Sequence, residues 1–327
     1  MALAPPISGE ALARGLRNEF RLTWQKRFRG LEGELGRIMQ LALASDKIEE
    51  LYGFGEPPAP PRRRPWGDEV HREGFRFRNF TVENVAWDAS VEWFKHQRLF
   101  DQLKDLDRLA RQSGEEFAEI PERVAAQIVQ ATVDPDLLDI IPNAPDGVAI
   151  YSAVDGDGAD RFGVTGGNVL TGGAGIGSSD AIRQDTFNAL ERKGSFLTPK
   201  GQPAISPRFL TNFTIWFPIT LWEVMLEAFR QTRTLDGGAA LTNVTIEAGL
   251  TITLLPSPRI VGTTRFQFLD QFEPKPLFEQ IAQPLDEQVQ VEGNSDVARR
   301  QKLEGIFWET IRGYGVNLPL GTMSIAP

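Results

Sequence analysis

The sequence predicts an α+β fold, in which strands and helices are mixed without a regular βαβ rhythm. Three observations support this class. Residues 75–93 alternate apolar and polar side chains over a length that is unusual for a strand. The stretch that follows them has the heptad spacing of a long helix. Further strand and helix patterns succeed one another in the second half of the chain, with no detectable internal repeat.

The first segment, residues 10–45, has helix-like spacing and an excess of positive charge. Its basic residues include Arg14, Arg17, Arg21, Lys26, Arg27 and Arg29. We interpret the segment as an amphipathic N-terminal arm. An ordinary first helix with a solvated face explains the same pattern. A nucleic-acid-binding module in residues 10–30 is a more distant interpretation, because the rest of the chain is acidic.

A proline-rich basic stretch, EPPAPPRRRPW at residues 56–66, precedes the long strand. Proline removes ladder donors and stiffens the backbone, so this stretch suits the tip of a loop. The strand itself has one apolar face, formed by Val85, Trp87, Ala89, Val91 and Trp93. The apolar phase shifts by one residue before Phe80, which predicts a β-bulge near Asn79.

The length of this strand suggests that it leaves its own domain. At about 3.3 Å per residue the run reaches roughly 60 Å, whereas a typical strand has about 5 to 6 residues. We therefore expect a long hairpin with a rigid cationic end. Its tip could stack on nucleic acid or pair with an acidic patch on a neighbouring copy, and we favour the protein partner. The predicted contacts between subunits are Arg62, Arg63, Arg64, Trp66, Phe75 and Phe77.

The next element is a helix that begins near Leu99. Its apolar or small positions alternate four and three residues apart, at Leu99, Leu103, Leu106, Ala110, Ser113, Phe117, Ile120 and Val124. Ser113 and Glu116 have the spacing of a capping box, and Pro121 cannot continue the hydrogen-bond ladder. The element is therefore expected to be kinked or to consist of two successive helices. A coiled-coil dimer is the rival interpretation, but it needs the heptad to continue past the proline.

Residues 132–177 are rich in Asp, Gly and Pro and predict a long surface excursion, followed by a helix that Ser178 or Ser179 caps. An apolar strand at 213–217 then precedes a helix, for which Thr220 and Glu223 have capping-box spacing. Further strands are expected at 244–254, around Phe266 and Phe268, and at 306–315.

Composition limits the classes of function. The chain has 327 residues, 41% of them hydrophobic, which is enough for a substantial core. Its formal net charge of -9 disfavours adhesion to nucleic acid through the whole surface. The absence of cysteine excludes disulfides and thiolate chemistry. The start lacks an apolar signal region and no apolar stretch reaches about 18 residues, so we expect a protein of the aqueous cytoplasm, with no membrane partner.

Catalytic and metal-binding patterns are weak, and we predict no enzyme and no cofactor. The glycine run at 163–177 precedes a helix but matches neither GxxxxGK[ST] nor GxGxxG, so a flexible surface loop is preferred to a phosphate site. His71 and His96 are the only histidines and lack metal-binding spacing. The DGDGAD stretch at 155–160 lacks the terminal glutamate of a calcium loop.

In order and spacing, several stretches resemble the major capsid proteins of tailed phages, in particular the Mu-like major head subunit family with the HK97 fold. They are LYGFGEPPAP at 51–60, NFTVENVAWDASVEWFKHQRLFDQ at 79–102, DGVAIYSA at 146–153, GNVLTGG at 167–173, FLTPKGQPAI at 196–205 and EGIFWETIRGYG at 304–315. The sequence departs from Mu-like relatives in lacking a histidine soon after the DG segment. Their WYL-like stretch is represented here only by Phe266, Phe268 and Leu269.

The resemblance implies an N-terminal arm at 1–46, an extended E-loop hairpin at 47–84 and a peripheral domain at 85–135 and 263–327, whose long spine helix covers about 98–131. It implies an axial domain at 136–262. The implied function is a structural shell subunit that forms hexameric and pentameric capsomers around double-stranded DNA, in a virion assembled in the host cytoplasm. Scaffold, portal and decoration proteins are further candidate partners. An encapsulin-like nanocompartment is the nearest alternative, and a phosphate- or nucleotide-binding enzyme using residues 163–177 is a distant one.

Overall fold

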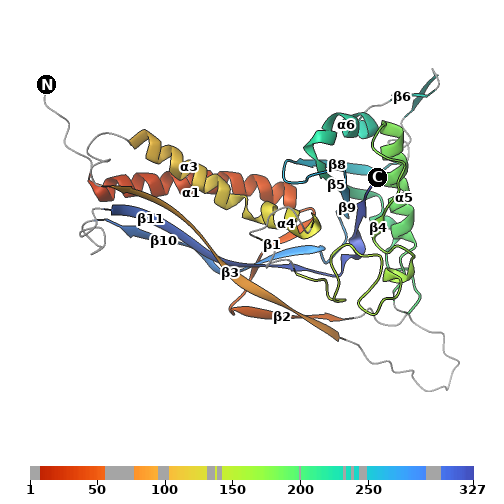
Figure 1. Cartoon of the computed structure of the whole chain (residues 1–327), viewed down its shortest axis with the longest axis horizontal. Helices are drawn as coiled ribbons and strands as arrows, with labels where there is room; N and C mark the ends of the chain where they lie inside the picture. Colours follow the sequence, from red (N-terminus) through yellow and green to blue (C-terminus); the bar gives the residue numbers. More distant parts are fainter. Residues whose placement is uncertain are drawn as a thin grey trace.

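Figure 1 shows a computed structural model of the chain, which describes residues 8–55, 77–94, 103–130, 137, 142–198, 200–230, 233–236, 239–242, 249–291 and 303–327. Within these ranges the fold is built on two five-stranded sheets, and helices cover one face of the first. The α+β prediction is confirmed.

The first sheet has the strand order β1-β10-β11-β3-β2. Its strands are β1 (Met39–Ala44), β2 (Glu49–Gly55), β3 (Phe77–Phe94), β10 (Leu277–Gln290) and β11 (Leu303–Val316). All neighbouring pairs are antiparallel except β1 with β10. The helices α1 (Gly9–Leu35) and α3 (Leu103–Ala118) lie on one face of this sheet, and α4 (Ile120–Gln130) continues from α3 (Figure 1).

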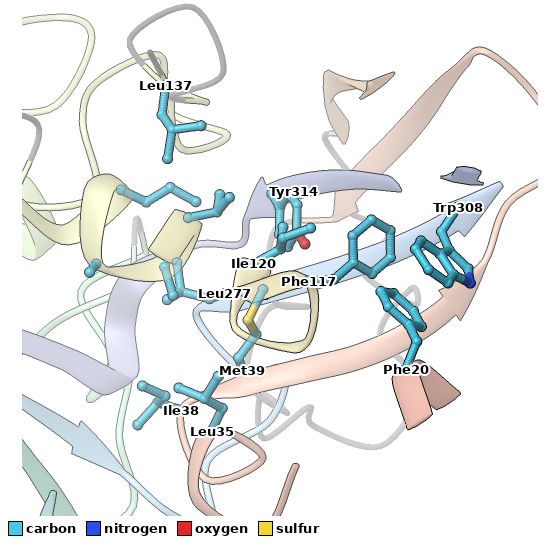
Figure 2. Close-up of a cluster of buried hydrophobic side chains, with 14 of the residues drawn as sticks. Phe20, Leu35, Ile38, Met39, Phe117, Ile120, Leu137, Leu277, Trp308 and Tyr314 are labelled. Atoms are coloured by element: carbon cyan, nitrogen blue, oxygen red, sulfur yellow. The ribbon is translucent and has the colours of Figure 1, made fainter. Parts of the chain in front are cut away.

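Aromatic side chains join these helices to the sheet. Phe20 of α1 stacks on Trp308 of β11 with ring centroids 3.9 Å apart, and Phe117 of α3 lies 5.9 Å from Phe20 (Figure 2). Phe20 and Trp308 are fully buried. The apolar side of the first segment thus packs inside its own chain, as that of an ordinary first helix does.

The second sheet has the order β4-β12-β9-β5-β8. Its strands are β4 (Val169–Leu170), β5 (Asn212–Pro218), β8 (Thr251–Ser257), β9 (Arg265–Leu269) and β12 (Thr322–Ile325). The helices α5 (Ser179–Gly194) and α6 (Trp222–Arg230) share a separate apolar core with it. A small ribbon of β6 (Arg233–Asp236) and β7 (Ala239–Thr242) lies beside α6 (Figure 1).

The long strand is confirmed, but the predicted bulge is wrong. β3 has 18 residues, and its register is continuous against β2 from Phe77 to Glu83 and against β11 from Asn84 to Phe94. The phase of the apolar residues changes because burial changes sides. Val82 and Asn84 are buried on the face opposite the helices, whereas Val91 and Trp93 are buried beneath the helices. A strand that is covered on different faces along its length produces the same sequence pattern as a bulge.

The heptad-patterned element consists of two successive helices, as one of the two interpretations predicted. The break falls at Glu119, two residues before Pro121. Leu106, Ala110 and Phe117 are buried as expected. The predicted capping box is wrong, because Ser113 and Glu116 lie within α3, ten or more residues after its first described residue, and not at a helix start.

Later elements are close to prediction. Ser178 caps α5, its Oγ accepting a hydrogen bond from the Ala181 amide at 3.2 Å. The strands around 213–217, 266–268 and 306–315 are confirmed as β5, β9 and β11. Thr220 lies in a 3-10 turn (Ile219–Leu221) whose N-cap is Pro218, so the capping box predicted before α6 is wrong. Residues 244–248 of the strand predicted at 244–254 lie outside the described part of the chain, and β8 begins at Thr251.

Candidate functional site

The hairpin formed by β2 and β3 projects beyond the packed helices and sheets (Figure 1). We call its paired base the root of the hairpin. β2 and β3 pair antiparallel from Glu49 opposite Glu83 to Gly55 opposite Phe77. β2 has β3 as its only strand partner among the described residues. Ile48 and Leu51 at this root are 80% and 65% exposed. The exposed apolar side chains mark the root as a surface that another molecule can cover.

An aromatic cluster holds this root to the sheet. Tyr52 stacks on Phe80 with centroids 5.6 Å apart and meets the edge of Phe278 of β10 at 4.9 Å. The Tyr52 hydroxyl donates to Gln280 Oε1 at 2.5 Å. The hairpin direction is therefore set by contacts with β10, which follows more than 180 residues later in the chain.

A polar network completes the root. Gln280 Nε2 donates to Asn84 Oδ1 at 2.9 Å, and Asn84 Nδ2 donates to the Lys47 carbonyl at 2.7 Å. A Cβ at Gly313 would lie 2.7 Å from Asn84 Oδ1, so glycine is required beside this network. Neither Asn84 nor Gln280 was predicted from the sequence to have a role. Their signal was a polar residue, Asn84, in the same strand phase as the buried Val82.

The residues predicted to contact another subunit lie mostly outside the described part of the chain. These are Arg62, Arg63, Arg64, Trp66 and Phe75, and the same holds for His71 and His96. Phe77 is the first residue of β3, and its backbone pairs with Gly55, but its side chain is not among those described. The role of all six contact residues stays a prediction.

Backbone amides of the glycine-rich loop, which was considered as a phosphate site, bind a carboxylate of the protein itself. The amides of Ala174 and Gly175 donate to the two oxygens of Asp185, at 2.6 and 3.4 Å. Arg265 Nη2 donates to the same carboxylate at 2.7 Å, and both charged side chains are fully buried. Burial lowers the pKa of Arg265, while its hydrogen bond to the Asp185 carboxylate opposes that shift. The amides of Ala174 and Gly175 thus already hold an anionic group.

The aspartate-rich stretch at 155–160 is also organised by internal bonds. Asp155 Oδ1 accepts from the amides of Asp157 and Ala159 at 3.0 and 2.9 Å. Next to it, Arg161 is buried and bonds to Asp146 at 2.7 Å and to the Ile150 carbonyl at 2.8 Å. The stretch therefore acts as a fixed turn. Among the described residues, no group of three or more His, Asp or Glu side chains has the arrangement of a metal site.

A clasp of ion pairs connects the helices to the second sheet. Glu119, at the break between α3 and α4, accepts from Arg27 Nε of α1 at 3.0 Å and from Arg259 Nη2, which follows β8. One turn further on, Glu122 accepts from the Ser257 hydroxyl at 2.7 Å. The sequence showed no sign of this clasp, because its members lie far apart in the chain and each resembles an ordinary surface charge.

Lys193 of α5 is fully buried beneath the second sheet and donates to the Gln267 carbonyl at 3.0 Å. Burial lowers its pKa well below the ordinary value of 10.5, and the nearby Asp270 opposes the shift. The folded state therefore binds fewer protons here than the unfolded state at pH values below 10.5 and above the lowered pKa. Stability from this group rises with pH through that window and is lost as the pH falls.

Replacing Lys193 with methionine is expected to stabilise the chain by roughly 1 kcal/mol near pH 7, because it removes a buried amine whose charged form burial disfavours and keeps the volume. The difference from wild type should shrink as the pH rises towards 10. Urea denaturation of both proteins at several pH values between 7 and 10 measures this. The exposed Lys200→Met substitution is the control, and a gain at Lys193 that does not change with pH would contradict the argument.

A hollow of about 670 Å³ lies along the outer side of α3. It is wide open and is lined by charged and amide side chains, among them Asp107, Arg111, Glu115 and Glu119. Arg111 and Glu119 already form ion pairs with α1, to Glu19 and Arg27. Such a hollow lacks the apolar, enclosed character of a substrate pocket. No helix in the described part of the chain is long and apolar enough to cross a bilayer.

Comparison with known proteins locates the fold. No known family model and no curated protein sequence matches this chain. Among solved structures, the capsid of the native GTA particle matches with a TM-score of 0.54 and 13% identity, covering 90% of each chain. The capsid of the cyanophage P-SCSP1u matches with a TM-score of 0.53 and 11% identity, over 89% of this chain and 86% of that one.

A virus-like particle from Pyrococcus furiosus also matches, with a TM-score of 0.50 and 11% identity, over 94% of this chain and 98% of that one. The likeness in each case extends over nearly the whole chain and is one of backbone rather than of sequence. The chain thus has an HK97-like fold, which confirms the fold that the resemblance implied. Its placement in the Mu-like subfamily stays a prediction.

Proposed function

We propose that this chain is the major capsid subunit of a tailed phage, a structural protein whose copies assemble into an icosahedral shell around double-stranded DNA. The observation that carries the proposal is the fold itself, which is shared over about nine-tenths of the chain with the capsids of the GTA particle and of a cyanophage. Asp185 accepts hydrogen bonds from two amides of the glycine loop, and the hollow along α3 is open and charged.

The projecting hairpin supplies a mechanism for assembly. A two-stranded ribbon is only marginally stable in water, so it gains order by lying across another copy. Its exposed Ile48 and Leu51 provide apolar area for such a contact. Many modest contacts repeated around closed symmetry give a stable shell, since each subunit meets several partners at once. In this assignment residues 1–46 are the arm, 47–84 the E-loop, 85–135 and 263–327 the peripheral domain, and 136–262 the axial domain.

The proposed partners are other copies of the chain, in hexameric and pentameric capsomers. Scaffold, portal and decoration proteins are candidate further partners, and assembly in the host cytoplasm is part of the same proposal. A protein nanocompartment is the second candidate function, which the match to the virus-like particle from Pyrococcus furiosus supports. A nanocompartment and a phage head differ in their content, protein in the one and nucleic acid in the other.

Negative-stain electron microscopy of the purified chain after size exclusion tests the proposal, with nucleic acid quantified in the same fractions. Uniform shells, tubes or capsomer rings are the expected result. Shells that contain nucleic acid favour a phage head, and shells that contain a protein cargo favour a nanocompartment. A chain that remains monomeric at every salt and protein concentration, with and without co-expressed phage head proteins, would contradict a capsid role.

The hairpin tip gives a sharper prediction. The substitution Arg64→Glu is expected to lower the yield of assembled shells roughly tenfold or more, since a factor of ten corresponds to about 1.4 kcal/mol per contact. The unassembled chain should keep its unfolding midpoint. Sedimentation of the variant measures assembly, and the substitution Arg230→Glu, at an exposed residue of α6, is the matched control. If Arg64→Glu forms normal shells, the hairpin tip does not contribute to the contact between subunits.

A further inference from the structure

The long strand β3 changes its partner at Asn84. β11 pairs with β3 from Phe94 to Asn84, and β2 pairs with it from Glu83 to Phe77. The hairpin therefore continues beyond the support of β11, because the ladder between β11 and β3 ends at Gly313, opposite Asn84. The direction in which the hairpin leaves the sheet depends on the contacts that hold this junction.

One buried amide side chain, that of Gln280 in β10, joins both strands of the hairpin. Its Oε1 accepts from the Tyr52 hydroxyl of β2 at 2.5 Å. Its Nε2 donates to two groups of β3, Asn84 Oδ1 at 2.9 Å and the Val82 carbonyl at 3.3 Å. Gln280 is fully buried. A carboxamide carries donors and an acceptor at one end, so neither a carboxylate nor an apolar side chain of this size makes the same set of bonds.

The bond from Gln280 to Asn84 passes over Gly313. These three residues form one row across β10, β11 and β3, with Gly313 in the middle. The two amide side chains thus meet across two strand spacings, or about 9.5 Å. A Cβ on Gly313 would lie 2.7 Å from Asn84 Oδ1 and 2.8 Å from Gln280 Nε2. Glycine inside a strand often marks such a close approach, and here it leaves room for the bond.

Asn84 extends the network to the turn that precedes β2. Its Nδ2 donates to the Ser45 hydroxyl at 3.0 Å and to the Lys47 carbonyl at 2.7 Å. Each of the two amide nitrogens therefore has two acceptors, and each amide oxygen has a donor. We call the side chains of Tyr52, Asn84 and Gln280 the root latch. It connects β10 with β2, with β3 and with the turn between β1 and β2.

We propose that Gln280 is a positioning residue, which fixes the direction of the hairpin through the root latch before another copy is bound. The aromatic contacts of Tyr52 with Phe80 and Phe278 have little directionality, whereas hydrogen bonds require a defined geometry. A buried network in which every amide group is bonded selects one orientation. Its use in assembly rests on the proposed function, since a hairpin that already has its bound direction loses less conformational freedom on meeting another copy.

Distances within one copy of the chain test this role. The sequence has no cysteine, so Asn79→Cys on the hairpin and Leu109→Cys on α3 provide two exposed sites for spin labels. Double electron–electron resonance on the unassembled full-length chain, diluted with unlabelled chain, should give one narrow distance distribution. With Gln280→Leu the population outside the main peak should rise about tenfold, because the loss of bonds to a buried amide shifts the orientation equilibrium by roughly that factor. The matched control Gln288→Leu, at an exposed glutamine of the same strand, should leave the distribution unchanged.

Tyr52→Phe is the second variant, and it decides the question if Gln280→Leu does not fold. It removes one hydroxyl from the root latch and keeps the aromatic ring, so it should broaden the distribution less than Gln280→Leu does. Three results would overturn the inference. They are a broad distribution in the parent chain, an unchanged distribution in the folded variant, and equal broadening by Gln288→Leu.

Shell formation is scored separately, by negative-stain microscopy of the parent chain. A narrow distance distribution in a chain that never forms shells supports the positioning role of Gln280 and contradicts the proposed function. Shells from a chain whose distribution is broad contradict the positioning role and leave the proposed function standing. The two inferences can therefore fail independently.

Discussion

Replacing Asp185 with alanine is expected to lower the free energy of unfolding by about 3–5 kcal/mol, the cost of breaking a buried ion pair from one side. Asp185 and its partner Arg265 have side chains that are 0% and 1% exposed. The substitution leaves a guanidinium buried without its carboxylate. It also leaves the amides of Ala174 and Gly175 without their acceptor.

Urea denaturation of the unassembled chain measures the effect of Asp185→Ala. Asp88→Ala, an exposed aspartate on β3, is the matched control and should change stability by less than about 0.5 kcal/mol. Asp185→Asn separates the two contributions, because an amide oxygen still accepts from the loop amides but no longer balances the charge of Arg265. The free energy of unfolding of Asp185→Asn is expected to lie between the values for the wild type and for Asp185→Ala. A loss below about 1 kcal/mol for Asp185→Ala would show that the pair contributes little.

Replacing Trp308 with alanine is expected to cost about 3–5 kcal/mol, as truncation of a buried aromatic residue does. Trp308 is fully buried and stacks on Phe20, so the change opens a cavity between α1 and the first sheet (Figure 2). Neighbouring side chains can fill only part of this cavity, because Phe20 is itself packed against Phe117. Loss of this contact should loosen α1 before the rest of the fold.

The control for Trp308→Ala is Trp222→Ala on α6, where the side chain is 40% exposed. It removes the same atoms but leaves a smaller cavity, so a loss of at most about 2 kcal/mol is expected. Chemical denaturation gives both values, and hydrogen exchange reports whether protection is lost first in α1. Equal losses for the two tryptophans would mean that the stack of Phe20 on Trp308 does not organise the helical layer.

Several elements were predictable from local sequence because their signals are local. The alternation through Trp93 identified β3, and the four-and-three spacing through Phe117 identified α3. Ser178 capped its helix as predicted, because a cap depends on a hydroxyl and an amide three residues apart. The bulge predicted near Asn79 was wrong because its signal, a change in the phase of the apolar residues, has more than one structural cause. A change of phase reports that burial changes, whereas only the packed structure shows whether the register or the covered face has changed.

The capping boxes at Ser113 and Thr220 failed because the motif is short and satisfied by chance. Ser113 and Glu116 have the right spacing, but α3 packs on α1 and stays helical through both residues. Propensity at one turn contributes about 1 kcal/mol, which burial of several apolar residues outweighs. The predicted site residues at the hairpin tip have no such local test, and assembly experiments decide their role.

By itself, the sequence determined the α+β class, the long projecting strand and the order of segments that resembles capsid subunits, because each depends on periodicity or on neighbours along the chain. Only the tertiary structure decided which charges meet. Asp185 and Arg265 are 80 positions apart, and Tyr52 reaches Gln280 across 228. Pairing of this kind depends on how the two sheets and their helices pack.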